Sequence, residues 1–472
     1  MTIFDFDVWQ WLVLLQHELL LFAGIFFLIG AVDDLAVDLT WIWLKLTGRA
    51  KTPQLDRNAL RQSSLSGDAA VFIPTWQEAE VIGYTIKHVL KSWPQDGMRL
   101  YIGCYRNDGA TIDAVMQAAG NDPRLRVVIH DRLGPSTKAD CLNRLYLALC
   151  DDERRRGTRA HMVVFHDAED MVDPAALPLL DQAIGRHAGG AQFVQLPVQP
   201  LPQPASVLVG SHYCEEFAEA HGKGMVVRDA LGAGLPGAGV GCALEREALE
   251  QIRMRHADRL PFETDSLTED YEMGLSITDL GGRSRFLRAR GDDGQLIATR
   301  AYFPDRLHTV VRQKTRWVHG IALQGWDRIG WSGGLVESWM RARDRRGPLT
   351  AFVLLMGYLL LAISAVIWGA VELGQGTAMP LSPALKALLW VNFIAFIWRA
   401  SWRFAFTARI YGVAEGLMAI VRIPITNIIS IMAGRRALVA YIASLRGRGV
   451  VWDKTHHTAH PMRFDAVGEG QS

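Results

Sequence analysis

Cysteine is scarce in this 472-residue chain, and its few copies are scattered. The five cysteines are Cys104, Cys141, Cys150, Cys214 and Cys242. No CxxC pair occurs among them, and their spacing matches no familiar zinc-ligand pattern. We therefore expect reduced thiols in the core of a domain that faces the cytosol.

Neither positive nor negative charge is in excess. Lys and Arg together number 50 against 49 Asp and Glu, which leaves a formal net charge of +1. No global field attracts nucleic acid, so a nucleic-acid partner is not expected. Hydrophobic residues nevertheless make up 49% of the chain, and its length exceeds that of one ordinary domain. This composition predicts a chain that combines globular and membrane parts.

The first long apolar run, residues 11–31, predicts a membrane anchor. Its length of about 20 residues matches the hydrocarbon thickness of a bilayer. It lacks the basic start and the cleavage site of a signal peptide, so residues 1–31 are expected to remain as a transmembrane helix. Acids precede this helix and Lys45 and Arg49 follow it, which predicts that its carboxyl end is cytoplasmic.

Residues 32–66 predict an amphipathic helix on the membrane surface, followed by a linker. Asp33, Asp34 and Asp38 are interspersed there with apolar and aromatic residues at near-helical spacing. Packing beneath the first membrane helix is the alternative explanation of the same pattern.

Two further membrane helices are expected in the carboxyl-terminal part. A basic linker at residues 331–348 precedes two apolar stretches, 349–371 and 384–406, each long enough to span a bilayer. The loop between them has no Lys or Arg, whereas Arg399 and Arg403 lie near the far end of the second stretch. The chain is therefore expected to return to the cytoplasm.

The stretch at residues 410–432 is apolar but interrupted. Arg422 and Pro424 lie within it, which favours an interfacial or re-entrant helix over a fourth span. Residues 433–472 are expected to form a cytosolic tail that ends in disorder.

Between the membrane segments, residues 67–330 alternate short apolar runs with helical patterns. Four runs are typical of buried strands: residues 69–73, 100–104, 125–129 and 162–165. A helical pattern at residues 78–91 separates the first two runs, which is the βα rhythm of a parallel sheet. We therefore predict a cytosolic α/β domain.

Acidic residues follow the fourth run, at the point where that strand must end. Asp167 and Glu169 would lie on the same side of an extended backbone, and Asp170 follows them. Ligands bind at the carboxyl ends of strands in open α/β sheets, and carboxylate oxygens suit Mg²⁺ or Mn²⁺. The alternative is a solvated acidic turn in which Asp170 caps the next helix.

Polar residues at the ends of other strands extend the same rim. The first strand runs into Thr75, Trp76 and Glu78. The second ends near Asp108, where an Asp-Gly pair favours a turn. Plain strand–helix connections would explain each of these residues taken alone.

Two more stretches predict helices that carry polar residues. Residues 266–269 have the spacing of a capping box, which would place Asp270 in the first turns of a helix. Gln313 and Trp317 are four apart in a helical pattern and share a face, with Arg316 beside them. An interfacial tryptophan and a membrane-proximal arginine are the alternative explanation of the second stretch.

The order of these motifs resembles that of the family 2 inverting glycosyltransferases. Six segments carry the resemblance: FIPTWQE at 72–78, NDG at 107–109, KADCLN at 138–143, HDAED at 166–170, TED at 268–270 and QKTRW at 313–317. The fourth resembles the family's metal-binding DxD motif, and the fifth its TED motif. The sixth matches the QxxRW of processive members such as cellulose, hyaluronan and poly-N-acetylglucosamine synthases. One short motif would be weak, whereas six in order are a specific signal.

This resemblance implies roles for the residues of a donor site. Thr75 and Glu78 would line the uridine pocket of a UDP-sugar, with Trp76 at a position that is often aromatic. Asp108 would contact the uracil. Lys138 would neutralise the diphosphate, a task suited to a compact cation.

The resemblance also implies a metal, Mg²⁺ or Mn²⁺. Asp167 and Glu169 would approach the nucleotide and the metal ion. The family usually has Asp where Glu169 stands in this sequence, so Asp170 competes for the role of metal ligand.

Catalytic and acceptor roles follow from the last two motifs. Asp270, with Glu269 beside it, matches the family's base, which takes a proton from an acceptor hydroxyl as that hydroxyl attacks the anomeric carbon. A single displacement of this kind inverts the anomeric centre. Gln313 and Arg316 would hold the UDP-sugar, the guanidinium clamping the diphosphate, and Trp317 would stack under a sugar ring of the acceptor.

The resemblance implies a GT-A fold, with a Rossmann-like, mainly parallel sheet flanked by transmembrane helices. The expected enzyme is a multi-pass protein of the bacterial inner membrane, with a cytoplasmic catalytic domain at residues 67–330. It would transfer a hexose or N-acetylhexosamine from a UDP-sugar to a growing polysaccharide or glycan. WDKTHH at residues 452–457 also resembles the bacteriophage adsorption protein B family, whose catalytic half has this layout.

Two alternative functions stay open at this point. One is non-processive transfer to a lipid-linked acceptor, and the other is a catalytically silent scaffold of an envelope or phage-receptor complex. Three spans are few for a polymer pore, so a homodimer or a partner export channel is a further expectation.

Overall fold

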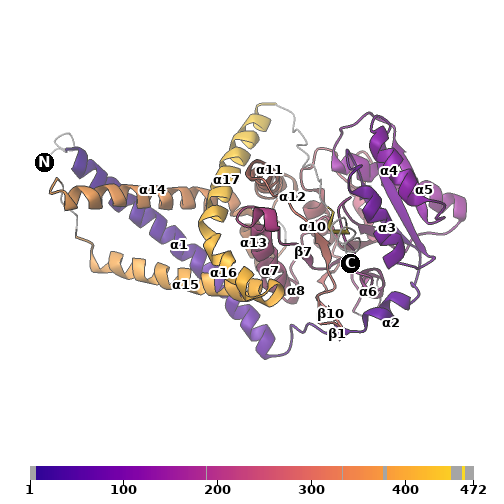
Figure 1. The fold of residues 1–472 in the computed structure, drawn as a ribbon, viewed down its shortest axis with the longest axis horizontal. Helices are drawn as coiled ribbons and strands as arrows, with labels where there is room; N and C mark the ends of the chain where they lie inside the picture. Colours follow the sequence, from indigo (N-terminus) through magenta and orange to yellow (C-terminus); the bar gives the residue numbers. More distant parts are fainter. Residues whose placement is uncertain are drawn as a thin grey trace, which may run out of the picture.

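The computed structural model describes residues 7–185, 187, 189–331, 333–375, 380–447 and 460–462. An elongated group of helices on one side joins a larger α/β part on the other (Figure 1). Residues 452–457, which carry part of the family resemblance, lie outside the described residues.

A seven-stranded sheet forms the centre of the α/β part. Its order is β4 (Leu125–His130), β3 (Met98–Tyr105), β2 (Ala69–Pro74), β5 (Met162–Phe165), β8 (Cys242–Glu245), β6 (Phe193–Gln195) and β9 (Ser284–Phe286). Strand β8 runs antiparallel to β5 and β6, and the other neighbours are parallel. All four predicted strands are present as β2 to β5, so the predicted α/β class with a mainly parallel sheet is confirmed.

Helices cover both faces of the sheet because alternate side chains of each strand point to opposite faces. Val71 and Ile73 pack on one face with α3 (Ile82–Ser92), while Phe72 packs on the other with α5 (Lys138–Arg156). The side chains that pack on each face of the sheet are apolar and buried. This explains why each strand is a continuous hydrophobic run in the sequence.

The remaining short elements surround this sheet. The helices are α2 (Arg57–Gln62), α4 (Gly109–Ala119), α6 (Ala176–Ala183), α7 (His212–Glu219), α8 (Met225–Ala230), α9 (Arg246–Arg255), α10 (Glu269–Asp279), α11 (Leu307–Trp317), α12 (Gly325–Ile329) and α13 (Leu335–Arg345). Two small parallel sheets pair β1 (Gln54–Leu55) with β10 (Arg290–Gly291), and β7 (Val198–Pro200) with β11 (Thr299–Ala301). Two π-helical turns, Ala220–Gly224 and Val318–Gln324, follow α7 and α11.

Among the residues that the structure describes, four helices are long and apolar enough to cross a membrane: α1 (Val8–Leu46), α14 (Gly347–Glu372), α15 (Pro383–Tyr411) and α17 (Ile423–Leu445). The first three form the elongated part, whereas α17 lies across the direction of α14 and α15 (Figure 1). The predicted spans 349–371 and 384–406 fall within α14 and α15.

The structure divides residues 410–432 differently from the single helix predicted there. The segment comprises the end of α15, the short helix α16 (Val413–Val421) and the start of α17. Gly412 ends α15 with a positive φ of 93°, and Arg422 separates α16 from α17. The guanidinium of Arg422 pairs with buried Glu215 at 2.9 Å, which explains how a charge is accommodated in an apolar stretch.

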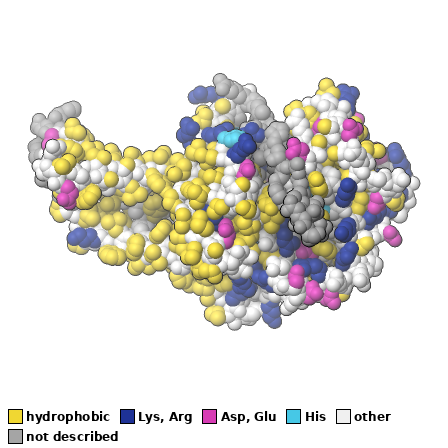
Figure 2. Space-filling view, viewed as in Figure 1, with side chains coloured by type: hydrophobic (Ala, Val, Ile, Leu, Met, Phe, Trp, Pro, Cys, Tyr) yellow, Lys and Arg dark blue, Asp and Glu magenta, His cyan; other side chains and the backbone are white. Residues whose placement is uncertain are grey.

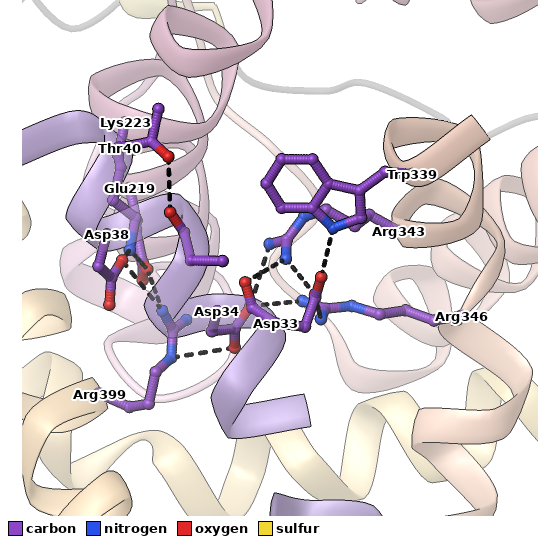
Figure 3. A network of polar contacts seen from close by, with 11 residues as sticks. Asp33, Asp34, Asp38, Thr40, Glu219, Lys223, Trp339, Arg343, Arg346 and Arg399 are labelled. Atoms are coloured by element: carbon purple, nitrogen blue, oxygen red, sulfur yellow. Dashed lines mark hydrogen bonds and ion pairs between the residues drawn. The ribbon is translucent and has the colours of Figure 1, made fainter. Parts of the chain in front are cut away.

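Helix α1 is uninterrupted through residue 46, so the boundary predicted at residue 31 does not exist as a break in structure. Its aspartates face inward rather than toward solvent, as Figure 3 shows. Asp33 pairs with Arg346 at 2.6 Å, and Asp34 pairs with Arg399 at 3.3 Å. Asp38 is fully buried and pairs with Lys223 of the π-helical turn after α7. These ion pairs attach α1 to the carboxyl end of α13, to α15 and to the α/β part.

The opposite face of the same segment is apolar and exposed. Val32, Leu35, Leu39, Trp43 and Leu46 recur at helical spacing and are each at least 40% exposed. The segment therefore combines the two patterns that its sequence allows: carboxylates packed under the membrane helices, and a hydrophobic stripe available to lipid.

Candidate active site

One cleft at the carboxyl ends of the central strands gathers most of the predicted site residues. The predicted residues that line it are Lys138, Asp167, Glu169, Asp170, Glu269, Asp270, Gln313, Arg316 and Trp317. They come from four segments that are far apart in the sequence: the start of α5, the loop after β5, the start of α10, and α11. The fold therefore brings four separate motifs to one place.

Lys138 lies among the carboxylates of the cleft. It is the first residue of α5, whose amino terminus is capped by the Thr137 side chain. Its Nζ atom lies 2.6 Å from Oδ1 of Asp167 and 3.7 Å from Oε1 of Glu269. Burial alone would lower the pKa of Lys138, but Asp167, Glu269 and Asp270 together raise it above its ordinary value. The ammonium group therefore stays charged.

Asp170 organises the loop that carries the acids. Its Oδ2 atom accepts a hydrogen bond from the backbone N–H of Asp167 at 2.9 Å and lies 2.8 Å from Nδ1 of His166. Its side chain is almost fully buried, and this burial raises its pKa. It does not cap the next helix, because α6 begins only at Ala176 and has no side-chain cap. That alternative to a metal-site role is wrong.

Asp167 and Glu169 are the acids of this loop that fit a divalent cation best. Both line the cleft, and their oxygens are hard donors of the kind that Mg²⁺ and Mn²⁺ prefer. Within the ranges that the structure describes, no three or more His, Cys, Asp or Glu side chains converge on a common ion position. An ion here would therefore need oxygens from phosphate or water, which is usual for Mg²⁺ sites that bind nucleotides.

Helix α10 begins in a way that differs from the predicted capping box. The helix starts at Glu269 after Thr268, and no side chain caps it. Ser266 instead donates its hydroxyl hydrogen to the Glu272 carboxylate at 2.7 Å. The prediction that Asp270 lies in the first turn is nevertheless correct, because the helix starts one residue before it.

The acids of α10 have raised proton affinities. Burial raises the pKa of Glu269 to about 7 and also raises the pKa of Asp270, while Lys138 lowers both. A glycine makes this packing possible: Gly239 has a φ of 77°, and a Cβ atom there would lie 2.6 Å from Oδ2 of Asp270. Only glycine allows the backbone to approach the carboxylate so closely.

Helix α11 presents the QxxRW residues to the same cleft. Oε1 of Gln313 accepts a hydrogen bond from the Tyr213 hydroxyl at 2.6 Å, and the Trp317 ring packs 6.0 Å from the Tyr213 ring. Both side chains contact Tyr213, as expected for residues that share a helical face. The Nε atom of Arg316 is buried and has no hydrogen-bond partner among the described residues.

The π-helical turn after α11 connects the QxxRW motif to the TED loop. Gln324 donates through Nε2 to the carbonyl of Asp265 at 2.9 Å and accepts from the N–H of Leu267 at 3.1 Å. A Cβ atom at Gly320 would lie 2.5 Å from the Thr268 hydroxyl oxygen, so glycine is needed there too. π-Turns are frequent at functional sites, and this one fixes two parts of the cleft relative to each other.

Four residues predicted for the nucleotide pocket lie at the same edge of the sheet, in the loops after β2 and β3. They are Thr75, Trp76, Glu78 and Asp108. Oδ2 of Asp108 accepts from the N–H of Gln77 at 2.5 Å, and Trp76 packs edge-on against Tyr105 with ring centroids 5.2 Å apart. None of the four is among the residues that line the cleft, so the structure brings them to the edge without joining them to the carboxylates.

Comparison with known proteins identifies the family. Residues 67–320, more than half of the chain, match the profile described as glycosyltransferase like family 2. The chain belongs to this family.

Curated relatives of this family 2 glycosyltransferase include two proteins of Escherichia coli. Bacteriophage adsorption protein B of strain K12 is 30% identical over 478 residues, which cover 95% of this chain and 62% of that protein. Bacteriophage N4 adsorption protein B of strain O157:H7 gives the same values. The resemblance seen in the sequence is thus confirmed, and the chain spans 62% of the length of these relatives.

Two solved structures are similar to this chain to different degrees. The mannosyltransferase PcManGT from Pyrobaculum calidifontis, in complex with GDP-Man and Mn²⁺, has a TM-score of 0.50 at 17% identity and covers 85% of this chain and 98% of that chain. Glucosyl-3-phosphoglycerate synthase from Mycobacterium tuberculosis, with Mn²⁺ and UDP, has a TM-score of 0.36 at 17% identity, over 60% of this chain and 88% of that chain. The first likeness confirms the predicted GT-A fold.

The structure of this family 2 glycosyltransferase also adds an aromatic wall that the sequence did not reveal. Phe217, Tyr302 and Phe303 line the cleft beside Trp317. The Phe217 ring lies 5.2 Å from that of Phe303 and 6.4 Å from that of Trp317. These aromatics belong to no motif, so only their position in the fold identifies them.

Proposed function

We propose that this family 2 glycosyltransferase transfers a hexose or N-acetylhexosamine from a UDP-sugar to a glycan, with inversion, at the cytoplasmic face of the bacterial inner membrane. One observation carries the proposal: Lys138, Asp167, Asp270 and Arg316 line a single cleft. These residues supply two cations for a diphosphate, an acid for a metal and a second acid for a proton.

The donor would bind at the end of the cleft formed by α5 and the loop after β5. Lys138 and Arg316 would contact the diphosphate, and the unpartnered Nε of Arg316 favours such a contact. Asp167 and Glu169 would hold Mg²⁺ or Mn²⁺, which when bound offsets the charge of the departing diphosphate. Thr75, Trp76, Glu78 and Asp108 would form the nucleoside side, at the ends of β2 and β3.

Asp270 would act as the base. The acceptor hydroxyl oxygen forms a bond to the anomeric carbon while the bond from that carbon to the diphosphate oxygen breaks, and the hydroxyl proton passes to Asp270. A raised pKa suits a group that must accept a proton near neutral pH. Glu269 would interact with the same ammonium group as Asp270, since Nζ of Lys138 lies 3.7 Å from Oε1 of Glu269.

The acceptor would occupy the aromatic end of the cleft. Trp317 and Phe303 offer flat apolar surfaces on which sugar rings can stack. Helix α11, which carries Trp317, packs against α17, so this end lies toward the membrane helices. That position suits a growing glycan or a lipid-linked acceptor. The length of the product separates these two, and a homodimer or a partner channel would serve export of a long one.

A donor survey on the purified full chain in lipid nanodiscs tests the proposal. With Mn²⁺ present, UDP release is expected from one member of a panel of UDP-hexoses and UDP-N-acetylhexosamines, and Asp270→Asn should slow it by about 10²–10⁴. Asp113→Asn, an exposed acid of α4, is the matched control and should leave UDP release unchanged. GDP-mannose belongs in the panel because PcManGT was solved with GDP-Man. Release of GDP alone would overturn the UDP assignment.

The scaffold alternative has its own support. The second acid of the metal motif is Glu169 rather than Asp, and the curated relatives are described by bacteriophage adsorption. Absence of nucleoside diphosphate release from every donor would favour that alternative over an enzyme.

A further inference from the structure

A second cavity, of about 730 Å³, lies where the carboxyl end of α1 meets the catalytic part. Six basic residues line it: Lys45, Arg49, Lys51, Arg283, Arg285 and Arg288. Asp229 is the one acid among its lining residues, and it lies 3.5 Å from Arg285. The cavity therefore carries a large excess of positive charge, although the whole chain is nearly neutral.

Among the described residues, four of the six cations of this cavity have no carboxylate partner, whereas Arg285 pairs with Asp229. In the part of the chain that the structure describes, no ion pair within 4.0 Å joins Lys45, Arg49, Lys51 or Arg288 to an acid. Arg288 donates to the Thr52 hydroxyl at 3.0 Å, but its Nε atom is buried without a hydrogen-bond partner. A buried donor left unsatisfied is costly, so this group calls for an acceptor that protein atoms do not supply.

Repulsion between the guanidinium groups near Arg288 also indicates that an anion binds there. Burial, together with the neighbouring guanidinium groups of Arg290 and Arg409, lowers the pKa of Arg288 to about 10. Repulsion among cations that are partly removed from water destabilises the folded chain unless an anion offsets it. The catalytic cleft differs, because its lysine is surrounded by carboxylates.

The cavity lies at the end of a membrane helix, which indicates that the anion is a lipid headgroup. Lys45 is in the last turn of α1, between Trp43 and Leu46, where the exposed apolar stripe ends. The Arg49 guanidinium stacks 4.7 Å over the Trp43 ring. Figure 2 shows Lys and Arg side chains gathered along the lower edge of the molecule, where the hydrophobic membrane part meets the α/β part. Apolar and aromatic residues next to a basic pocket are the pattern of a lipid site at the cytoplasmic interface.

We propose that this cavity binds the phosphate headgroup of an anionic phospholipid, with Lys51 and Arg288 contacting the phosphate and the α1 stripe contacting the acyl chains. The site is separate from the catalytic cleft, since the two share no lining residue. The ion pairs of Asp33, Asp34 and Asp38 attach the catalytic part to the membrane helices. The bound lipid would attach it directly to the bilayer at a separate place. Binding of the lipid at this cavity does not depend on the proposed glycosyl transfer.

Equilibrium binding of radiolabelled phosphatidylglycerol to the full chain, in micelles of neutral detergent and phosphatidylcholine, tests the proposal. The double variant Lys51→Glu/Arg288→Glu should bind at least about tenfold more weakly, because two attractive charges become repulsive. Arg154→Glu is the matched control: Arg154 lies on α5 of the same domain, its side chain is 79% exposed, and its replacement should leave binding unchanged.

A single variant and two competition results also distinguish a lipid site from the alternatives. Lys51→Glu alone changes an exposed loop residue, so its weaker binding at an unchanged melting temperature would support the site even if the double variant misfolds. Equal loss in Arg154→Glu, or equal binding of labelled phosphatidylcholine, would overturn the proposal. Full displacement by millimolar inorganic phosphate would identify a soluble phosphate as the ligand and overturn the lipid assignment.

Discussion

The Nζ atom of Lys138 lies 2.6 Å from Oδ1 of Asp167, joining the start of α5 to the loop after β5. This contact places a positive charge at the acid predicted to approach the metal and the nucleotide. Because Glu269 and Asp270 also interact with the ammonium group, Lys138 balances acids from both sides of the cleft. Its removal should therefore affect donor binding and the base together.

Lys138→Gln should weaken UDP binding by about 1.5–3 kcal/mol, the range for hydrogen bonds to charged groups. The uncompensated acids would also repel the diphosphate. Calorimetric titration of UDP with Mn²⁺ present measures the change, and Lys91→Gln, an exposed lysine of α3, serves as the control. Unchanged affinity in Lys138→Gln would remove this residue from the donor site.

Asp270→Asn should retain UDP binding but lower kcat by about 10²–10⁴, the usual contribution of a general base. The amide keeps the size of the side chain and its hydrogen bond from the N–H of Tyr271, so α10 should start normally. Titration of UDP and single-turnover rates on the same preparation separate the two effects. A variant with normal turnover would assign the base to another acid, and Glu269 is the nearest alternative.

The parts of the fold that could be predicted depend on local pattern. Buried parallel strands produce continuous apolar runs, and their carboxyl ends share one edge, so the sequences of β2, β3 and β5 predict the edge of the sheet at which the candidate site lies. Asp167 and Asp270 lie about 100 residues apart, yet the resemblance of their two motifs to those of one family implies a shared site.

The parts that could not be predicted depend on distant partners. Asp33 and Asp34 in α1 suggest a polar surface until Arg343 and Arg346, more than 300 residues later, are seen to neutralise them. The aromatic wall is similar: Phe217 and Phe303 approach each other only in the folded chain. No spacing rule connects such residues, since their proximity is a product of topology.

The pH dependence of turnover should report the raised pKa of Asp270. Below that pKa the carboxyl is protonated and cannot accept the hydroxyl proton, so kcat should fall as pH decreases through it. Burial raises the pKa above the ordinary value of 3.8, so the midpoint of the fall should lie above 3.8. Lys138 lowers this pKa, so the residual activity of Lys138→Gln should show a midpoint at still higher pH. A midpoint at or below 3.8 at saturating donor would contradict the assignment.

Removing one partner of the buried pair between Glu215 and Arg422 should destabilise the protein. Both side chains are fully buried, and the guanidinium contacts the carboxylate at 2.9 and 3.1 Å. Glu215→Gln leaves a buried charge less compensated, which costs about 3–5 kcal/mol and should lower Tm in detergent. Glu215→Leu with Arg422→Met should cost less than the sum of the two single changes, because neither charged member of the pair is left opposite an apolar side chain. The double variant still costs something, since Arg403 and Glu415 each lose an ion-pair partner. The control is Asp151→Asn, which breaks the exposed pair with Arg154 and should cost less than about 1 kcal/mol. Equal Tm losses in Glu215→Gln and Asp151→Asn would show that burial of the first pair contributes nothing.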